Sequence, residues 1–315
     1  MGESEILKGA YSAELYADDI DDLWKHGVPR GTSIGWRLLD AYYTVPRGQW
    51  TVMTGFSGSG KSTFLDNVYV QLAKNHGWKF LICSPENQPI RRHIAGLMEI
   101  YAGRKFGKYD AQHPTGRETW FMTEAEYKQA YAFVCEHFYF INPPDTDFTV
   151  DGIIAIAGEV YDNHFKFDGM VLDPYNEIEH KRPAGLSETE YISTVLAKFR
   201  QFTRQLDIHF WFVAHPTKPV RLSVRFQADE LDDAAKKPKY QRATLFDISG
   251  SANWKNKCDF GLIVHRDMSD KVAPSIIEVE KVRFRENGGM GEVPMFYDYL
   301  CNRFVEHYDE LLFHK

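Results

Sequence analysis

Residues 55–62 read Gly-Phe-Ser-Gly-Ser-Gly-Lys-Ser and match the pattern G-x-x-x-x-G-K-[ST]. The apolar run QWTVMT at 49–54 precedes the motif, and a helical pattern from about 62 to 75 follows it. The motif requires this order, because its glycines turn backbone N–H groups toward phosphates at the first turn of a helix. The sequence therefore predicts a phosphate-binding loop between a buried strand and a helix.

The loop residues have separate expected roles. Lys61 is expected to reach the β- and γ-phosphates of a nucleoside triphosphate, and the Ser62 hydroxyl is expected to ligate Mg²⁺. The remaining cradle is expected from small residues of the loop and of the first helical turn, namely Gly55, Ser57, Gly58, Ser59, Gly60 and Thr63. The expected ligands are ATP, or another nucleoside triphosphate, and Mg²⁺.

Three polar residues follow other predicted strands. Asp173 ends the apolar run MVLD, Glu86 follows KFLIC, and His215 follows IHFWFVA. The carboxyl ends of parallel strands share one edge of a sheet, where ligands bind. Asp173 is expected to hold Mg²⁺ through water. A carboxylate such as Glu86 could orient and deprotonate the attacking water, and His215 could hydrogen-bond the γ-phosphate and sense its loss.

Strands alternate with helices along most of the chain, which predicts an α/β fold with a mostly parallel, doubly wound sheet and helices on both faces. Strands are expected at 79–83, 138–141, 168–173, 208–214, 260–265, 275–282 and 292–298, and helices at 15–27, 88–102, 123–137, 150–164 and 187–206. Residues 103–122 and 216–247 are polar and are expected to be irregular. We expect an arm at 1–30, one ATPase domain at 31–305 and a tail at 306–315.

Composition narrows the setting of the chain. It has 315 residues, a formal net charge of −7 and four cysteines without a C-x-x-C pair. Such cysteines are expected to be reduced thiols in a cytosol-like compartment. Neither a secretory signal nor a membrane-spanning apolar run is evident, so no membrane partner is expected. The acidic balance argues against a protein that wraps duplex DNA, although a channel with a few Lys and Arg could still bind a single strand.

The motifs form an ordered set: SPEN at 84–87, LDPYNE at 172–177, VAHP at 213–216, DISGSANWKNKCDFGLIVHRD at 247–267 and EKVRFRENGG at 280–289. Together they resemble the RecA-type hexameric replicative helicases of the DnaB group, in the Twinkle-like and phage primase-helicase branch. The resemblance covers about residues 30–305. It implies a RecA-like ATP-hydrolysing motor domain of a ring-forming DNA helicase, which translocates on single-stranded DNA during replication.

The resemblance also assigns residues around the nucleotide. Glu86 matches the catalytic carboxylate of the family, and His215 matches its phosphate-sensing residue. Arg266 matches a position that packs near the base. Many bacterial relatives carry Gln at the sensing position, so His215 points to the phage and mitochondrial branch.

An arginine finger is implied as well. Arg283 matches the residue that reaches the γ-phosphate of a neighbouring subunit, with Lys281 beside it. An Arg supplied in trans can increase the rate by roughly 10³–10⁵. Arg285 shares the side parity of Arg283 along the expected strand, so it is the alternative finger.

Two stretches are candidates for DNA contact. Residues 249–257 resemble the central-channel loop of the family, where Gly250 and Ser251 would let phosphates approach the backbone and Lys255 and Lys257 would add charge. Trp254 is expected to pack inside the protein. The loop 216–247 adds Arg221, Arg225, Lys236, Lys237, Lys239 and Arg242. The expected partners are single-stranded DNA, further copies of the chain in a homo-hexameric ring, and a fused or separate primase domain.

Alternatives stay open at this point. A RecA-like recombinase or a DNA-packaging ATPase would use the same core, and a nucleotide-gated assembly module would bind without acting as a motor. Relatives in this branch carry an N-terminal primase or TOPRIM-like domain or a helical collar, whereas this sequence begins just before the motor. The stretch 15–27 lies in the place of their linker helix. A bacterial or phage-encoded cytoplasmic protein is expected, ahead of one in the mitochondrial matrix.

Overall fold

The computed structural model describes residues 11–112, 117–143, 148–178, 182–217, 242–250, 252–267 and 273–312. Its centre is a nine-stranded sheet with the order β3-β2-β4-β5-β1-β6-β7-β8-β9. The strands are β1 (Trp50–Thr54), β2 (Phe80–Cys83), β3 (Phe138–Phe140), β4 (Gly169–Leu172), β5 (His209–Val213), β6 (Phe260–His265), β7 (Ser275–Val282), β8 (Gly291–Asp298) and β9 (Arg303–Val305).

Eight helices accompany the sheet within the described ranges: α1 (Ala17–His26), α2 (Arg37–Asp40), α3 (Lys61–His76), α4 (Ile90–Ala102), α5 (Glu124–His137), α6 (Val150–Asn163), α7 (Glu188–Leu206) and α8 (Asn253–Lys257). Capping boxes start two of them, because the Thr123 and Ser187 hydroxyls accept from the backbone of Glu126 and Glu190, whose carboxylates accept in return. None of these helices is long and apolar enough to cross a membrane.

The sheet is parallel from β3 to β6, and β7, β8 and β9 extend it in antiparallel order. The strand β1 lies in its middle, between β5 and β6, and all five of its residues are buried. Fully buried strands of a parallel sheet are continuous apolar runs, which explains why they stood out in the sequence. The predicted fold class is confirmed.

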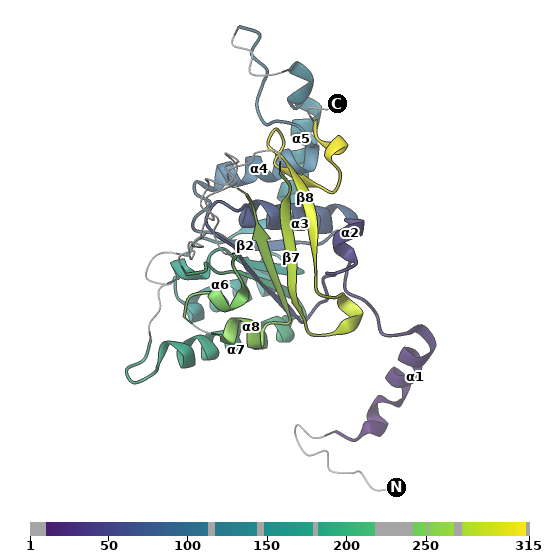
Figure 1. The fold of residues 1–315 in the computed structure, drawn as a ribbon, viewed down its shortest axis with the longest axis vertical. Coiled ribbons are helices and arrows are strands. Elements are labelled where there is room, and N and C mark those ends of the chain that lie inside the picture. Colours follow the sequence, from purple (N-terminus) through teal and green to yellow (C-terminus); the bar gives the residue numbers. More distant parts are fainter. Residues whose placement is uncertain are drawn as a thin grey trace, which may run out of the picture.

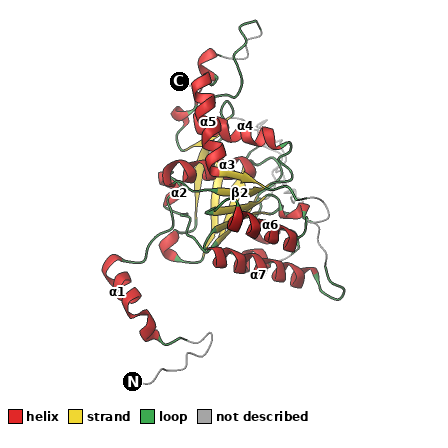
Figure 2. Ribbon diagram, turned by 180° about the vertical axis from the view of Figure 1, so that it is seen from behind, coloured by secondary structure: helices red, strands yellow, loops and turns green. Residues whose placement is uncertain are grey.

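Helices cover both faces of the sheet (Figures 1 and 2). One core includes side chains of α3, α4 and α5, such as Phe64, Leu97 and Val134. The other includes side chains of α6, α7 and α8, such as Ile153, Phe199 and Trp254. The two layers fix the parallel strands so that the polar residues at their ends cannot drift apart.

The helix α1 extends away from this body (Figure 1). It buries none of its side chains, and Trp24 is 87% exposed. It ends at Gly27, whose φ of 79° is accessible to glycine at little cost. A domain boundary at residue 30 stays a prediction, but the arm from residue 11 contributes nothing to the two cores.

Three local features differ from the expected pattern. Residues 253–257, expected in a loop, form the short helix α8. Strand β7 ends at Val282 and residues 285–287 form a 3₁₀ turn, so the side parity that linked Arg285 to Arg283 does not apply. The start of the expected tail packs on the body, since Leu311 and Leu312 are buried and the backbone N–H of Leu312 donates to Asp298.

Candidate active site

The phosphate loop joins β1 to α3 as its motif requires. Gly55 has φ 146°, and a Cβ atom there would lie 2.5 Å from the Val264 carbonyl oxygen and 2.9 Å from the Ser59 hydroxyl. Only glycine fits this close approach. Gly60 has φ 96° and starts α3 from a left-handed conformation. The Ser59 hydroxyl is buried and has no hydrogen-bond partner among the described residues, so a polar donor or acceptor is missing there.

Lys61 is buried in this loop. Its Nζ donates to the carbonyl oxygens of Gly55, at 2.8 Å, and Phe56, at 3.2 Å. Burial lowers the pKa of Lys61, and the nearby carboxylates of Asp173 and Glu86 act in the opposite direction. The amine is therefore held at the loop, next to the two carboxylates expected from the sequence.

Asp173 directly follows β4 and is 4% exposed. Its Oδ1 atom is buried without a hydrogen-bond partner in the described part of the chain. Burial raises the pKa of Asp173 to about 6, against a hydrogen bond with the Ser62 side chain, and Glu86 adds to the rise. A buried carboxylate oxygen beside a hydroxyl is the oxygen donor set that Mg²⁺ prefers, so the residues fit this ion.

Replacing Asp173 with asparagine should stabilise the protein when Mg²⁺ and nucleotide are absent. The folded-state pKa of about 6 lies above the ordinary value of 3.8, so the charged carboxylate destabilises the fold above pH 6, and this cost is relieved as the pH falls toward 3.8. The free energy of unfolding at pH 7.5 should rise by roughly 2–3 kcal/mol. Thermal unfolding without Mg²⁺ checks this, and a lower melting temperature would contradict it. The matched control is Asp162→Asn, at an exposed carboxylate.

Glu86 and His215 approach each other across the same edge of the sheet. His215 Nε2 lies 3.3 Å from Glu86 Oε1, and the two side chains are 31% and 48% exposed. The His215 backbone N–H donates to the Asn176 side chain at 2.9 Å, and the Ser84 hydroxyl donates to the Asp173 carbonyl at 3.1 Å. Hydrogen bonds thus connect the loops after β2, β4 and β5, as expected for strand ends at one edge.

These residues line a cleft of about 290 Å³. Its walls include Ser57, Gly58, Gly60, Lys61, Ser62, Thr63, Glu86, His215, Arg266, Tyr297 and Phe304. The Arg266 guanidinium lies 5.7 Å from the centre of the Tyr297 ring. Sequence reasoning missed Tyr297 and Phe304, because no motif marks them and only the antiparallel pairing of β8 and β9 brings them to the loop.

Arg283 lies at the opposite edge of the sheet. It follows Val282, which pairs with Phe260, and Phe260 pairs with Thr51 near the start of β1. The phosphate loop begins only at Gly55, about 13 Å farther along β1 at 3.3 Å per residue. Arg283 is therefore remote from the loop of its own subunit.

Other contacts hold the side chain of Arg283 in place. Its Nη1 donates to the buried Asp259 carboxylate at 2.7 Å, and its Nη2 donates to the Lys257 carbonyl at 3.4 Å. Arg285 is exposed and has no ion pair within the described residues. The Lys281 Nζ donates to the Lys255 and Asn256 carbonyls at the end of α8, and burial lowers its pKa. Lys281 is thus a helix-capping residue in this conformation.

The candidate DNA-contacting residues lie partly in α8. Lys255 pairs with Glu280, and Lys257 donates to the Ser193 backbone carbonyl at 3.0 Å. Gly250 has φ 94°, and a Cβ atom there would lie 2.4 Å from Ile192. Trp254 is fully buried, as predicted.

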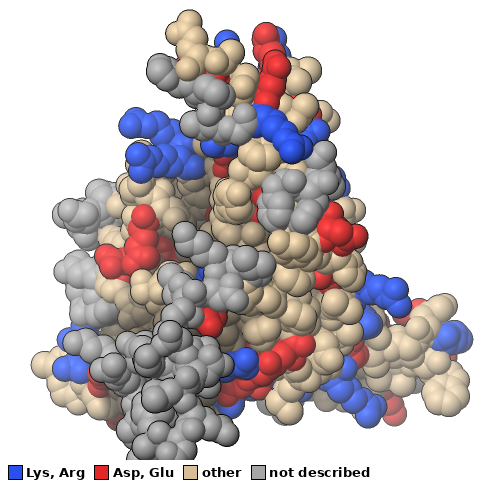
Figure 3. Space-filling model, turned by 45° about the horizontal axis from the view of Figure 1, so that its top comes forward, with Lys and Arg blue, Asp and Glu red and all other residues tan. Residues whose placement is uncertain are grey.

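Other candidates for DNA contact cannot be placed. Ser251 and residues 218–241, with Arg221, Arg225, Lys236, Lys237 and Lys239, lie outside the described residues. In Figure 3, Lys and Arg form separate groups among Asp and Glu, without one continuous basic face among the described residues in this view. Any contact with nucleic acid must therefore use a local group of residues.

Comparison with known proteins places this site in a family. No family model matches the chain. The Twinkle homolog protein, chloroplastic/mitochondrial, of Arabidopsis thaliana is 35% identical over 298 residues, which cover 93% of this chain and 39% of that protein. The chain belongs to the Twinkle-like branch of the RecA-type domains. It spans about two fifths of the length of this relative.

Solved structures share the fold of this Twinkle-like domain. One of them, an isolated ATPase domain, superposes with a TM-score of 0.69 at 16% identity, over 95% of this chain and 99% of that chain. A DnaB-like replicative helicase, described with its interactions with primase, also gives a TM-score of 0.69, at 17% identity, over 93% of this chain and 68% of that chain. Both confirm the RecA-like ATPase core of the Twinkle-like domain.

Proposed function

We propose that this chain is the ATP-hydrolysing motor domain of a ring-forming DNA helicase that translocates on single-stranded DNA during replication. The observation that carries the proposal is the division of the candidate residues between two edges of one sheet. Lys61, Asp173, Glu86 and His215 meet at the carboxyl edge, and Arg283 lies at the other. A head-to-tail assembly of copies would join the two halves into complete sites.

The carboxyl edge supports hydrolysis. Lys61 and the loop N–H groups would bind the phosphates, and Ser62 and Asp173 would hold Mg²⁺, which supplies positive charge next to the transferring phosphoryl group. Glu86 is exposed to solvent and close to Lys61, so it can accept a proton from the attacking water. His215, at 3.3 Å from Glu86, would report whether the γ-phosphate is present.

The wall of the cleft opposite the loop supports binding of the base. Arg266 and Tyr297 present a cation–π pair beside the phosphate loop. A planar base can stack on an aromatic ring or on a guanidinium group. Because both groups tolerate any base, we propose that the site accepts ATP and other nucleoside triphosphates.

Mixing experiments test whether Arg283 acts in trans. Wild-type protein mixed with increasing amounts of Arg283→Ala should lose more ATPase activity than the wild-type fraction predicts, because each variant copy deprives its neighbour of roughly 10³–10⁵ in rate. Activity strictly proportional to the wild-type fraction would rule out a trans finger. Arg285→Ala, at an exposed site two residues away, is the matched control. Arg283→Lys keeps a cation beside Asp259 but loses the bidentate fork, so it separates a finger from a folding defect.

The proposal as a whole is tested by measuring the ATPase rate against protein concentration, with and without single-stranded DNA, while light scattering follows the mass. Specific activity should rise steeply on assembly and rise again with DNA. A constant rate from a monomer that ignores DNA would leave the nucleotide site in place and overturn the helicase motor.

We further propose single-stranded DNA, other copies of the chain in a homo-hexamer and a primase domain, fused or separate, as partners. The segment that contains Gly250, Lys255 and Lys257 is the proposed contact with DNA. We place the protein in a cytoplasm, bacterial or phage-infected. An organelle is the alternative, since the relative from Arabidopsis thaliana is named chloroplastic/mitochondrial.

A further inference from the structure

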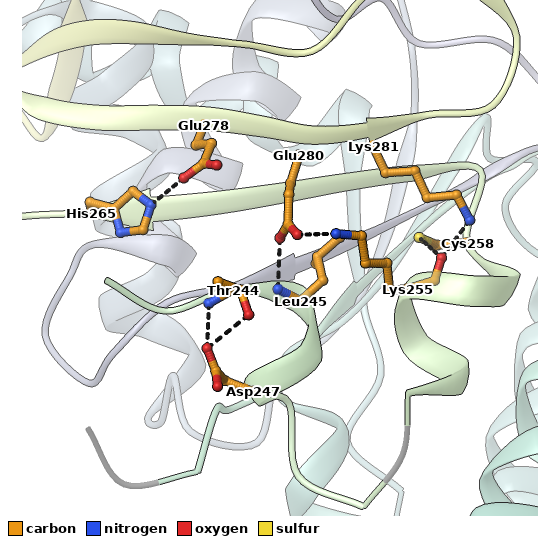
Figure 4. Close-up of polar contacts among 9 residues, drawn as sticks. All are labelled: Thr244, Leu245, Asp247, Lys255, Cys258, His265, Glu278, Glu280 and Lys281. Carbon is orange, nitrogen blue, oxygen red and sulfur yellow. Dashed lines mark hydrogen bonds and ion pairs between the residues drawn. The ribbon is translucent and has the colours of Figure 1, made fainter. Parts of the chain in front are cut away.

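One carboxylate on β7 holds two separate parts of the segment 245–257, which we name the channel segment. Glu280 accepts a hydrogen bond from the Leu245 backbone N–H at 2.7 Å, and it pairs with the Lys255 ammonium (Figure 4). Its side chain is 15% exposed. The Lys255 ammonium also lies 4.4 Å from the centre of the Phe246 ring. Both limbs of the channel segment therefore depend on one side chain of the neighbouring strand.

Two further residues after Glu280 contact the same segment. Lys281 donates to the Lys255 and Asn256 carbonyls, and Arg283 donates to the Lys257 carbonyl at 3.4 Å. The end of β7 that carries the proposed finger is thus attached to α8 at successive points (Figure 4). A shift of this strand end would move α8 with it.

The opposite end of the channel segment contacts the nucleotide site of its own subunit. The Ser249 N–H donates to the His215 carbonyl at 3.3 Å, and the Thr217 N–H donates to the Asp247 carbonyl at 2.7 Å. Pro216 and Ile248 form an antiparallel bridge. The segment therefore extends from His215 at one edge of the sheet to Arg283 at the other.

We propose that Glu280 is a positioning residue that makes the channel segment follow the strand bearing Arg283, so that nucleotide at the neighbouring subunit's site changes the affinity for single-stranded DNA. This inference rests on the proposed function. A carboxylate only accepts hydrogen bonds, and charge-assisted bonds to it are the strong ones. Because Glu280 is largely buried, separating either limb would leave a polar group unpaired, and the two limbs move together.

The same strand provides a matched control. Glu278 lies two residues before Glu280, on the same side of β7, and also carries a partner, because its carboxylate lies 2.7 Å from His265 Nε2 (Figure 4). It contacts no residue of the channel segment through a hydrogen bond or ion pair given by the structure. Removing its charge disturbs β7 to a similar extent without touching the channel segment.

The test measures binding without turnover. The dissociation constant of a fluorescent oligothymidylate is determined by anisotropy for the assembled protein, once with a non-hydrolysable ATP analogue and once with ADP, both with Mg²⁺. The ratio of the two constants is the coupling between the sites. Wild type should give a ratio well away from one. Glu280→Gln should bring it toward one by at least about fivefold, the low end of typical couplings. Glu280→Ala should do so at least as strongly, and Glu278→Gln should leave the ratio unchanged.

Other outcomes separate the inference from the proposed function. A wild-type ratio in either Glu280 variant overturns the inference, as does an equal loss of the ratio in Glu278→Gln. A fall in the DNA-free ATPase rate in parallel with the ratio would mean a general structural role and would also overturn it. If Glu280→Ala does not fold, Glu280→Gln decides alone. Wild-type ATPase that DNA does not stimulate would instead overturn the proposed function, and the inference with it.

Discussion

Lys61→Ala is expected to abolish nucleotide hydrolysis. The amine is fixed by two loop carbonyls at the base of the cleft, and no other lysine lines that cleft among the described residues. Its removal eliminates the positive charge that contacts the phosphates in both the bound and the transition state. Loss of a single preorganised donor costs on the order of 10²–10³ in rate, and a charged donor should cost at least as much.

Steady-state phosphate release and titration with a fluorescent nucleotide check this expectation together. Binding should weaken along with turnover, because the contact is present before the reaction. Lys74→Ala, at an exposed position in the last turn of the same helix, should leave both unchanged. Near-normal turnover in Lys61→Ala would refute the assignment of the phosphate loop.

Glu86→Gln is expected to keep nucleotide binding and to lose turnover. The amide has the shape of the carboxylate but cannot accept a proton from water, and general-base catalysis contributes typically 10²–10⁴ in rate. Removing this negative charge also reduces the repulsion near Asp173, whose pKa Glu86 helps to raise. Nucleotide affinity should therefore be equal to that of wild type or slightly higher.

Single-turnover hydrolysis and equilibrium binding measure the two effects separately. Glu177→Gln is a suitable comparison, because Glu177 is an exposed carboxylate after the neighbouring strand β4. Should Glu86→Gln lose binding, Glu86 would be a structural residue. Should it retain turnover, the proton acceptor would lie elsewhere in the cleft.

The parts of the fold that could be predicted are those whose signal is local. The loop at 55–62 has a fixed motif, and β1, β2, β4 and β5 are apolar runs that end in a polar residue. Because parallel strands share an edge, the meeting of Glu86 and His215 followed from their positions in the chain.

The parts that were missed depend on contacts between distant segments. α8 has five residues, too few for an apolar period, and it is stabilised by burial of Trp254 and by Lys281 at its carboxyl end. Tyr297 reaches the cleft only through the pairing of β8 with β9. The separation of Arg283 from Arg285 arises where β7 ends, and a strand end of this kind has no sequence signal in the run KVRFR.

The distance between Arg283 and the phosphate loop has a consequence for counting. If each chain presents one half of a site on each side, an open row of n copies contains n − 1 complete sites, with one unused half at each end. Closing the row into a ring completes the last site without adding a subunit. Maximal activity per chain then reports closure itself, so the catalytic rate could serve as a measure of whether the assembly has ends.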